Sequence, residues 1–294
     1  MSRLAAARTP RAAPPSLATA PAPHEDAACA AVAAAVGRLG EPSAEGPGAL
    51  FLGDPVRAAV ALAKTGVSRR EAVWALSESM ATALTDALRD GRQVFAERAL
   101  RRDPAGVLTA MAQAVGSPAP ARPLASLAQD LAGALPAAAV ADDPWLAALE
   151  LLAGPLAPGT EADWPLALFM AGDSPGASCP AAIDVTGRGR ILAYGPYLRL
   201  PAGRWRAGVV VEVCPDAARR PYRLEVSAGA TIARAVVAPG RPGPRTLAAD
   251  VELHDAAPVE LRLWLERAAF HGTLRFAGAR ITFLGPAPHR LEAP

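Results

Sequence analysis

The chain has few of the residues on which disulfide and metal chemistry depend. Its 294 residues include only three cysteines, and these lie far apart in the sequence: Cys29, Cys179 and Cys214. An odd, scattered set of this kind builds neither a disulfide framework nor a CxxC metal knuckle. Free thiols are typical of a reducing compartment, so we expect a cytoplasmic protein.

Histidine is equally scarce, and the familiar cofactor motifs are absent. The four histidines are His24, His254, His271 and His289, none of which stands in an HExxH pattern. There is no P-loop, and Gly187-Arg188-Gly189 lacks the third glycine and the following helix of a dinucleotide-binding turn. We therefore expect no metal site and no cofactor.

One motif is typical of a catalytic nucleophile. Residues 172–176 read GDSPG, which matches the G-x-S-x-G elbow of α/β-hydrolases. That elbow uses the backbone N–H of the residue after the serine, and here this residue is Pro175, which has no N–H. A helix should also follow the serine, but the sequence leads into a β region. We therefore assign no catalytic residue.

Long apolar runs and a concentrated basic patch are also missing. No stretch has the 18 or so uninterrupted apolar residues of a membrane span. The N-terminus begins basic but develops no apolar core of a secretory signal. The net charge is only +2, and the arginines are interspersed with acidic residues, so nucleic-acid binding is not expected. The single lysine and the lack of asparagine indicate a GC-rich, bacterial coding bias.

What is present divides the chain into a tail, a helical region and a β region. Residues 1–24 are rich in alanine and proline and predict disorder. Residues 25–172 predict a helical domain. Asp-Pro pairs at 54–55, 103–104 and 143–144 each join an N-cap to proline at the first helical position. The runs that follow end near Gly66, Gly116 and Gly154.

Further helices are predicted between these starts. Ser68 and Glu71 form a capping-box pattern for a helix that runs to Arg89. Other helical stretches are Ala27–Leu39, Arg92–Arg101, Leu124–Leu135 and Glu161–Phe169. A repeated helical hairpin is one interpretation of the three Asp-Pro starts, but their unequal spacings favour ordinary helix starts.

After a linker at 173–180, the period changes from helical to alternating. Residues 181–288 predict short strands separated by Gly/Pro turns, typical of a sandwich or barrel. The strands expected are Arg204–Val213, Tyr222–Ser227, Thr231–Val237, Thr246–Glu252, Val259–Glu266, Thr273–Phe276 and Arg280–Leu284. The predicted fold class is segregated α+β, an all-α region followed by an antiparallel, jelly-roll-like sandwich.

The alternation separates buried from exposed positions in the strand at 259–266. Val259, Leu261, Leu263 and Leu265 face inward, whereas Glu260, Arg262, Trp264 and Glu266 face outward. Trp264 is a large aromatic residue on a charged face. It is either a sugar-stacking platform flanked by Arg262 and Glu260, or a contact covered by the helical domain or by a loop, which is the interpretation we favour.

Two tyrosines flank a predicted turn in Tyr194-Gly195-Pro196-Tyr197. Packing on the sandwich edge is the favoured role for both, with ligand contact by Tyr197 as the alternative. This phrase and the following Leu200-Pro201-Ala202-Gly203-Arg204-Trp205, supported by 261–265 and Phe270-His271-Gly272, resemble accessory β-sandwich modules of bacterial cell-surface polysaccharide synthesis, some attached to glycosyltransferases. The resemblance covers the last 110 residues and implies a fold similar to carbohydrate-binding modules.

Three functional hypotheses follow. The first is a non-catalytic glycan-associated protein in which the sandwich binds or presents carbohydrate through Trp264, Arg262, Glu260 and Tyr197. The second is a scaffold that binds a protein partner through the helical domain, with Trp264 buried against the helices. The third is an enzyme with a site assembled between the domains.

Overall fold

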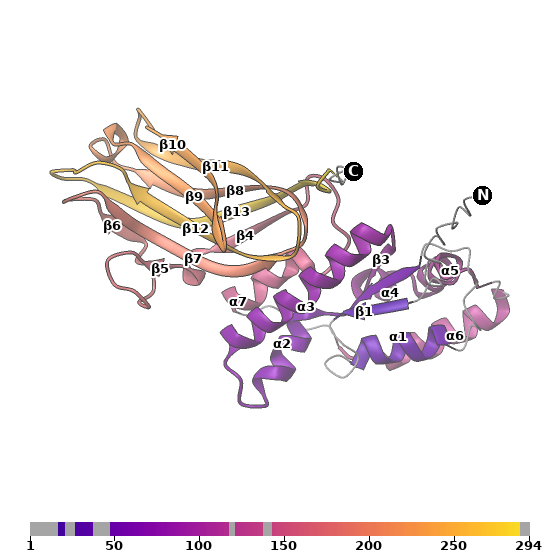
Figure 1. Ribbon diagram of the computed structural model, residues 1–294. Helices are drawn as coiled ribbons and strands as arrows, with labels where there is room; N and C mark the ends of the chain where they lie inside the picture. Colours follow the sequence, from indigo (N-terminus) through magenta and orange to yellow (C-terminus); the bar gives the residue numbers. More distant parts are fainter. Residues whose placement is uncertain (1–16, 21–26, 38–47, 118–120, 138–142, 289–294) are drawn as a thin grey trace, which may run out of the picture.

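The computed structural model describes residues 17–20, 27–37, 48–117, 121–137 and 143–288. Figure 1 shows a sandwich of long strands beside a smaller unit of helices and short strands. The predicted order, helical region first and strands second, is therefore observed. Apart from residues 17–20, the predicted tail lies outside the described residues, and His24 and His289 lie outside them too.

The N-terminal unit is not all-α, which corrects the prediction. Three short strands form a parallel sheet in the order β1-β2-β3: β1 (Leu17–Ala20), β2 (Ala49–Leu52) and β3 (Gln93–Ala96). All four residues of β2 are buried, so this strand shows no alternation of apolar and polar residues. β1 also falls within the segment predicted to be disordered.

Helices connect and cover these strands, and most begin where the capping residues predicted. They are α1 (Ala27–Gly37), α2 (Pro55–Ala63), α3 (Arg69–Asp90), α4 (Glu97–Arg102), α5 (Pro104–Ala114), α6 (Ala121–Ala134) and α7 (Pro144–Ala147), followed by the 3-10 helix η1 (Ala148–Leu152). Asp54, Asp103 and Asp143 cap α2, α5 and α7, and Ser68 and Glu71 form the predicted capping box of α3.

The C-terminal unit is a two-sheet antiparallel sandwich. Its strands are β4 (Glu161–Pro165), β5 (Met170–Ala171), β6 (Ala182–Asp184), β7 (Arg190–Leu200), β8 (Gly203–Val213), β9 (Tyr222–Ala228), β10 (Ala230–Val237), β11 (Gly243–Leu253), β12 (Ala257–Leu265) and β13 (Thr273–Gly285). One sheet has the order β10-β9-β12-β7-β5. The other has the order β11-β8-β13-β4, with β6 also paired to β13.

The sandwich begins earlier in the chain than the sequence predicted. Residues 161–169 are not helical: they form β4 and the 3-10 helix η2 (Leu166–Leu168), and β5 follows. Ala279 pairs with Trp164, which places β4 at the edge of a sheet. The predicted linker at 173–180 consequently connects β5 to β6 inside the sandwich.

Two predicted turns also lie within strands. Gly195-Pro196 is a cis peptide inside β7. The turn expected between Thr273–Phe276 and Arg280–Leu284 is a bulge at Ala277-Gly278 that lets β13 continue as one strand. Gly278 has a φ of 114°, and a Cβ atom there would lie 2.3 Å from the Trp164 carbonyl oxygen. Glycine is therefore required at this bulge.

The two units share one continuous core. Side chains of α2, α3 and η1 join the buried side chains of the sandwich, which include Trp205, Phe276 and Phe283. The Trp74 indole N–H of α3 donates to the Pro196 carbonyl at 3.2 Å, and the Ala202 N–H donates to the Thr85 hydroxyl at 2.8 Å. The helical unit thus packs against the end of β7 at residues 196–202.

Candidate ligand-binding face of the sandwich

The outer face of the five-stranded sheet carries charged and aromatic side chains, here called the polar face. Its members come from neighbouring strands: Tyr194 and Tyr197 of β7; Arg223, Glu225 and Ser227 of β9; and Glu260, Arg262 and Trp264 of β12, with Glu266 just beyond that strand. Val259, Leu261, Leu263 and Leu265 are at most 1% exposed, which confirms the predicted inward face of β12.

Three of the predicted site residues form one hydrogen-bonded cluster. The Tyr197 hydroxyl donates to Oε1 of Glu260 at 2.6 Å, and Arg262 donates to Oε2 of the same carboxylate at 2.5 Å. Glu260 is only 5% exposed, so its charge is neutralised mainly by this arginine. Burial raises the pKa of Tyr197, and the hydrogen bond to Glu260 raises it further. The hydroxyl therefore remains a donor.

Tyr197 reaches Glu260 through an unusual backbone conformation. Its φ is 66°, the only positive φ of a non-glycine residue among the described parts of the chain. A bulky residue in the left-handed region is strained, and such strain persists only where the surroundings hold it. Here the surroundings are the Glu260 carboxylate and the neighbouring α3 contact at Pro196.

A second cluster surrounds Trp264. Its indole N–H donates to Oε2 of Glu225 at 2.9 Å, and the Arg223 guanidinium carbon lies 4.6 Å from the ring centroid. Arg223 also pairs with Glu266 at 2.8 Å. Glu225 is 4% exposed and pairs in addition with Arg234 of β10 at 3.1 Å. The indole is thus fixed in position by two charged groups of the neighbouring strand β9.

Trp264 also borders a hollow at the surface. The hollow measures about 490 Å³ and is lined by Trp264, Ile191, Arg188, Arg190, Asp173 and two glycines, Gly172 and Gly189. Arg190 pairs with Asp173 across it at 2.9 Å. A hollow with one aromatic wall and several charged groups has the composition of a small-molecule site.

No described residue of the helical unit lines this hollow. α3 contacts β7 near residue 196, whereas Trp264 is paired with Ile191 towards the other end of the strand. The half-buried Trp264 is therefore covered by Arg223 and Glu225 of the sandwich. Among the described residues, no helix covers Trp264.

The four predicted residues share one face but not one cluster. Trp264 and Glu260 are four residues apart on β12, which separates their Cα atoms by roughly 13 Å. The alternation of β9 puts Arg223 and Glu225 on its outer side, but no local pattern puts them beside Trp264, because the pairing of β9 with β12 is a long-range contact. Asp173 was missed because its segment was assigned to a linker.

The motif at 172–176 forms a turn beside β7. The Ala171 N–H donates to the Ala177 carbonyl and the Gly172 N–H to the Leu192 carbonyl, which closes the turn without a following helix. The Gly176 N–H donates to the Tyr194 hydroxyl at 3.3 Å. Ser174 thus lies in a turn that supports the polar face.

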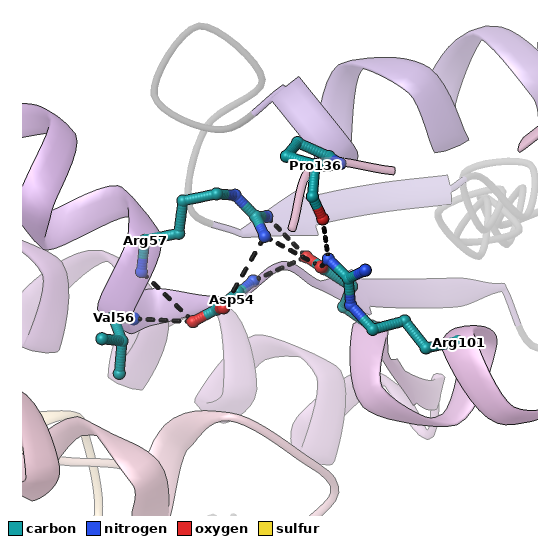
Figure 2. A network of polar contacts seen from close by, with 6 residues as sticks. Asp54, Val56, Arg57, Arg101 and Pro136 are labelled. Atoms are coloured by element: carbon teal, nitrogen blue, oxygen red, sulfur yellow. Dashed lines mark hydrogen bonds and ion pairs between the residues drawn. The ribbon is translucent and has the colours of Figure 1, made fainter. Parts of the chain in front are cut away.

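A second hollow lies at the carboxyl ends of β2 and β3. It measures about 330 Å³, and its wall includes Asp54, Glu97, Arg98, Arg101 and Glu150. Figure 2 shows Arg57 and Arg101 converging beside Asp54, with Pro136 accepting from Arg101. Open α/β sheets commonly bind ligands at this edge.

The buried carboxylate of this second hollow is, however, fully engaged. Glu97 is 3% exposed and accepts two hydrogen bonds from Arg57, at 2.9 and 2.6 Å. It also accepts one from Arg101 and one from the Asp54 N–H at 3.0 Å. Burial tends to raise the pKa of Glu97, but Arg57 and Arg101 outweigh burial and lower it. This network ties β3 to the start of α2.

No model of a known protein family matches the chain, and no curated protein matches it. Among solved structures, the chain is similar to a xylan-binding module, CBM15, with a TM-score of 0.32 and 12% identity over 44% of this chain and 99% of that one. It is also similar to the module TmCBM61 in complex with β-1,4-galactotriose, with a TM-score of 0.30 and 11% identity over 40% and 90% of the two chains. A CBM36-1 domain of a multidomain xylanase from the hindgut metagenome of Trinervitermes trinervoides has a TM-score of 0.24 and 12% identity, over 36% of this chain and 78% of that one.

Proposed function

We propose that the sandwich binds carbohydrate without chemical conversion, and that Trp264 and the hollow beside it form the binding site. The observation that carries this proposal is the position of the indole. Trp264 is fixed by Glu225 and Arg223, yet it borders a hollow of about 490 Å³. A rigid aromatic residue contributes contact area at low entropic cost, and neighbouring charges can hydrogen-bond sugar hydroxyls.

The carboxylates of the polar face support binding rather than catalysis. Glu260 accepts from Tyr197 and Arg262, and Glu225 accepts from Trp264 while pairing with Arg234. Glu225 and Glu260 are at most 5% exposed, and the Glu266 side chain, which is 28% exposed, is paired with Arg223. A general acid or nucleophile has to reach the glycosidic oxygen or carbon, and these groups are held inside the network instead.

The resemblance of residues 194–205 extends the proposal to a bacterial cell-surface polysaccharide context. A gene located among glycosyltransferases and polysaccharide exporters would support this extension. A location among unrelated genes would count against the context, though not against binding itself.

The test is a calorimetric titration of the full chain with neutral oligosaccharides chosen from a glycan array. We expect Trp264→Ala to weaken binding about thirtyfold, since a central aromatic contact contributes about 2 kcal/mol. Phe270→Ala is the matched control, because Phe270 is an exposed aromatic residue of the same sandwich outside the hollow. No binding to any glycan, or equal affinity in wild type and Trp264→Ala, would refute the proposal.

A further inference from the structure

Four loops form the end of the sandwich that lies away from the helices (Figure 1). They are residues 185–189, 214–221, 238–242 and 266–272, here called the tip loops. β7 begins at this end with Arg190 and reaches the α3 contact at residues 196–202. At a rise of about 3.3 Å per residue, the six residues from Arg190 to Pro196 separate the tip loops from the first contact with α3 by roughly 20 Å.

Backbone hydrogen bonds join the tip loops into one surface. Gly187 and Ala269 exchange two bonds, at 2.8 and 2.9 Å, and the Val185 N–H donates to the Gly272 carbonyl at 3.0 Å. The Gly240 N–H donates to the Ala218 carbonyl at 2.8 Å. The loop at 266–272 is also joined to the loop at 214–221, because Nε2 of His271 lies 3.2 Å from the Asp216 carboxylate. The tip is therefore a preformed platform.

This platform carries an excess of positive charge. The tip loops contain five arginines (Arg188, Arg219, Arg220, Arg241 and Arg267) and two acidic residues, Asp216 and Glu266. Five positive and two negative charges make +3, whereas the whole chain carries only +2. Both acids are engaged, Asp216 with His271 and Glu266 with Arg223. No ion pair of the five arginines is found within the described residues.

An apolar side chain projects from the same platform. Phe270 is 87% exposed, the most exposed large apolar residue in the described parts of the chain. Its two neighbours in the sequence are both fixed. Ala269 is hydrogen-bonded to the loop at 185–189, and His271 contacts the loop at 214–221. An exposed phenylalanine side chain gains free energy when it moves from water into an apolar environment.

We infer that the tip loops dock on a lipid bilayer that contains anionic phospholipids. The arginines bind the headgroup phosphates, and Phe270 enters the boundary between headgroups and acyl chains. An acidic polymer such as a sulfated polysaccharide would satisfy the arginines but offers no apolar phase for the phenylalanine. The combination of unpaired arginines and an exposed ring therefore favours a membrane surface. Among the described residues, none of the helices has the length and apolar character of a membrane span.

The test is co-sedimentation of the full chain with vesicles of phosphatidylcholine, with and without phosphatidylserine. We expect binding only when phosphatidylserine is present, and weaker binding at high salt. Phe270→Ala should weaken binding roughly tenfold, from the lost apolar contact. The double variant Arg219→Ala and Arg267→Ala should weaken it about thirtyfold, at roughly fivefold per arginine near the surface.

Matched controls keep this test separate from the carbohydrate proposal. Val67→Ala removes an exposed apolar side chain from the helical unit, and Trp264→Ala alters the proposed sugar site; both should leave vesicle binding unchanged. The inference is overturned if anionic vesicles do not bind the chain. It is also overturned if Phe270→Ala binds them as wild type does while dextran sulfate competes fully, since the tip would then recognise charge alone.

Discussion

Replacing Glu97 by glutamine should destabilise the protein by on the order of 3 kcal/mol at neutral pH. The substitution keeps the shape of the side chain but leaves Arg57 and Arg101 without their shared carboxylate. Removing one partner of a buried pair costs about 3–5 kcal/mol. The low end applies because the arginine side chains remain 17% and 27% exposed and can be partly solvated.

The effect should depend on pH with a definite sign. The arginines lower the pKa of Glu97 below its ordinary value of 4.5 in the folded state. The carboxylate therefore contributes stability that is fully present above pH 4.5 and is lost as the pH falls through the lowered pKa. The difference in free energy of unfolding between wild type and Glu97→Gln should therefore become smaller as the pH falls below 4.5.

Urea unfolding over a pH series measures both predictions. Glu150→Gln is the matched control, since Glu150 is an exposed carboxylate on the wall of the same hollow, and it should change the free energy of unfolding by less than about 0.5 kcal/mol. The network does not stabilise the fold as stated if Glu97→Gln lowers the free energy of unfolding by less than about 1 kcal/mol at neutral pH. The same holds if the difference in this free energy between wild type and variant grows as the pH falls.

Two further predictions concern the sandwich. Tyr197→Phe should lower the free energy of unfolding by about 1.5 kcal/mol, because it removes a hydrogen bond to a buried charge. In a double-mutant cycle with Glu260→Gln, the two losses of free energy should not add. Additive losses would show that this hydrogen bond contributes nothing to stability. Gly278→Ala should cost about 2 kcal/mol more in thermal unfolding than Gly229→Ala, since both have positive φ but only the former meets a backbone atom, the Trp164 carbonyl oxygen; equal losses would contradict the close approach at the bulge.

The sandwich could be predicted from sequence wherever its strands are long and half-buried. β12 alternates apolar and charged residues from Val259 to Leu263, and β8 does so towards each end of the strand, so the faces of both could be assigned one residue at a time. β4 alternates polar and apolar residues only from Glu161 to Trp164, and β5 has two residues, so neither segment is long enough for its period to distinguish a strand from a helix. All four residues of β2 are apolar and buried, so no alternation marks it as a strand, and the small parallel sheet could not be predicted from the pattern.

The candidate site shows the same division between local and long-range information. Glu260, Arg262 and Trp264 share a face because they alternate along one strand. Glu225 reaches the Trp264 indole only because β9 pairs with β12 in one particular register. Register depends on the packing of the whole sheet, which no local pattern encodes.

The central claim is that Trp264 is the aromatic wall of a carbohydrate site, and the indole N–H resonances of the five tryptophans test it most directly. Trp164 and Trp205 are at most 1% exposed, and Trp74 donates to Pro196 at the junction with the helices. On titration with an oligosaccharide that binds, the Trp264 signal should shift while these three stay in place. A bound sugar that leaves the Trp264 signal unmoved, or that shifts Trp74 instead, would show that the site lies elsewhere.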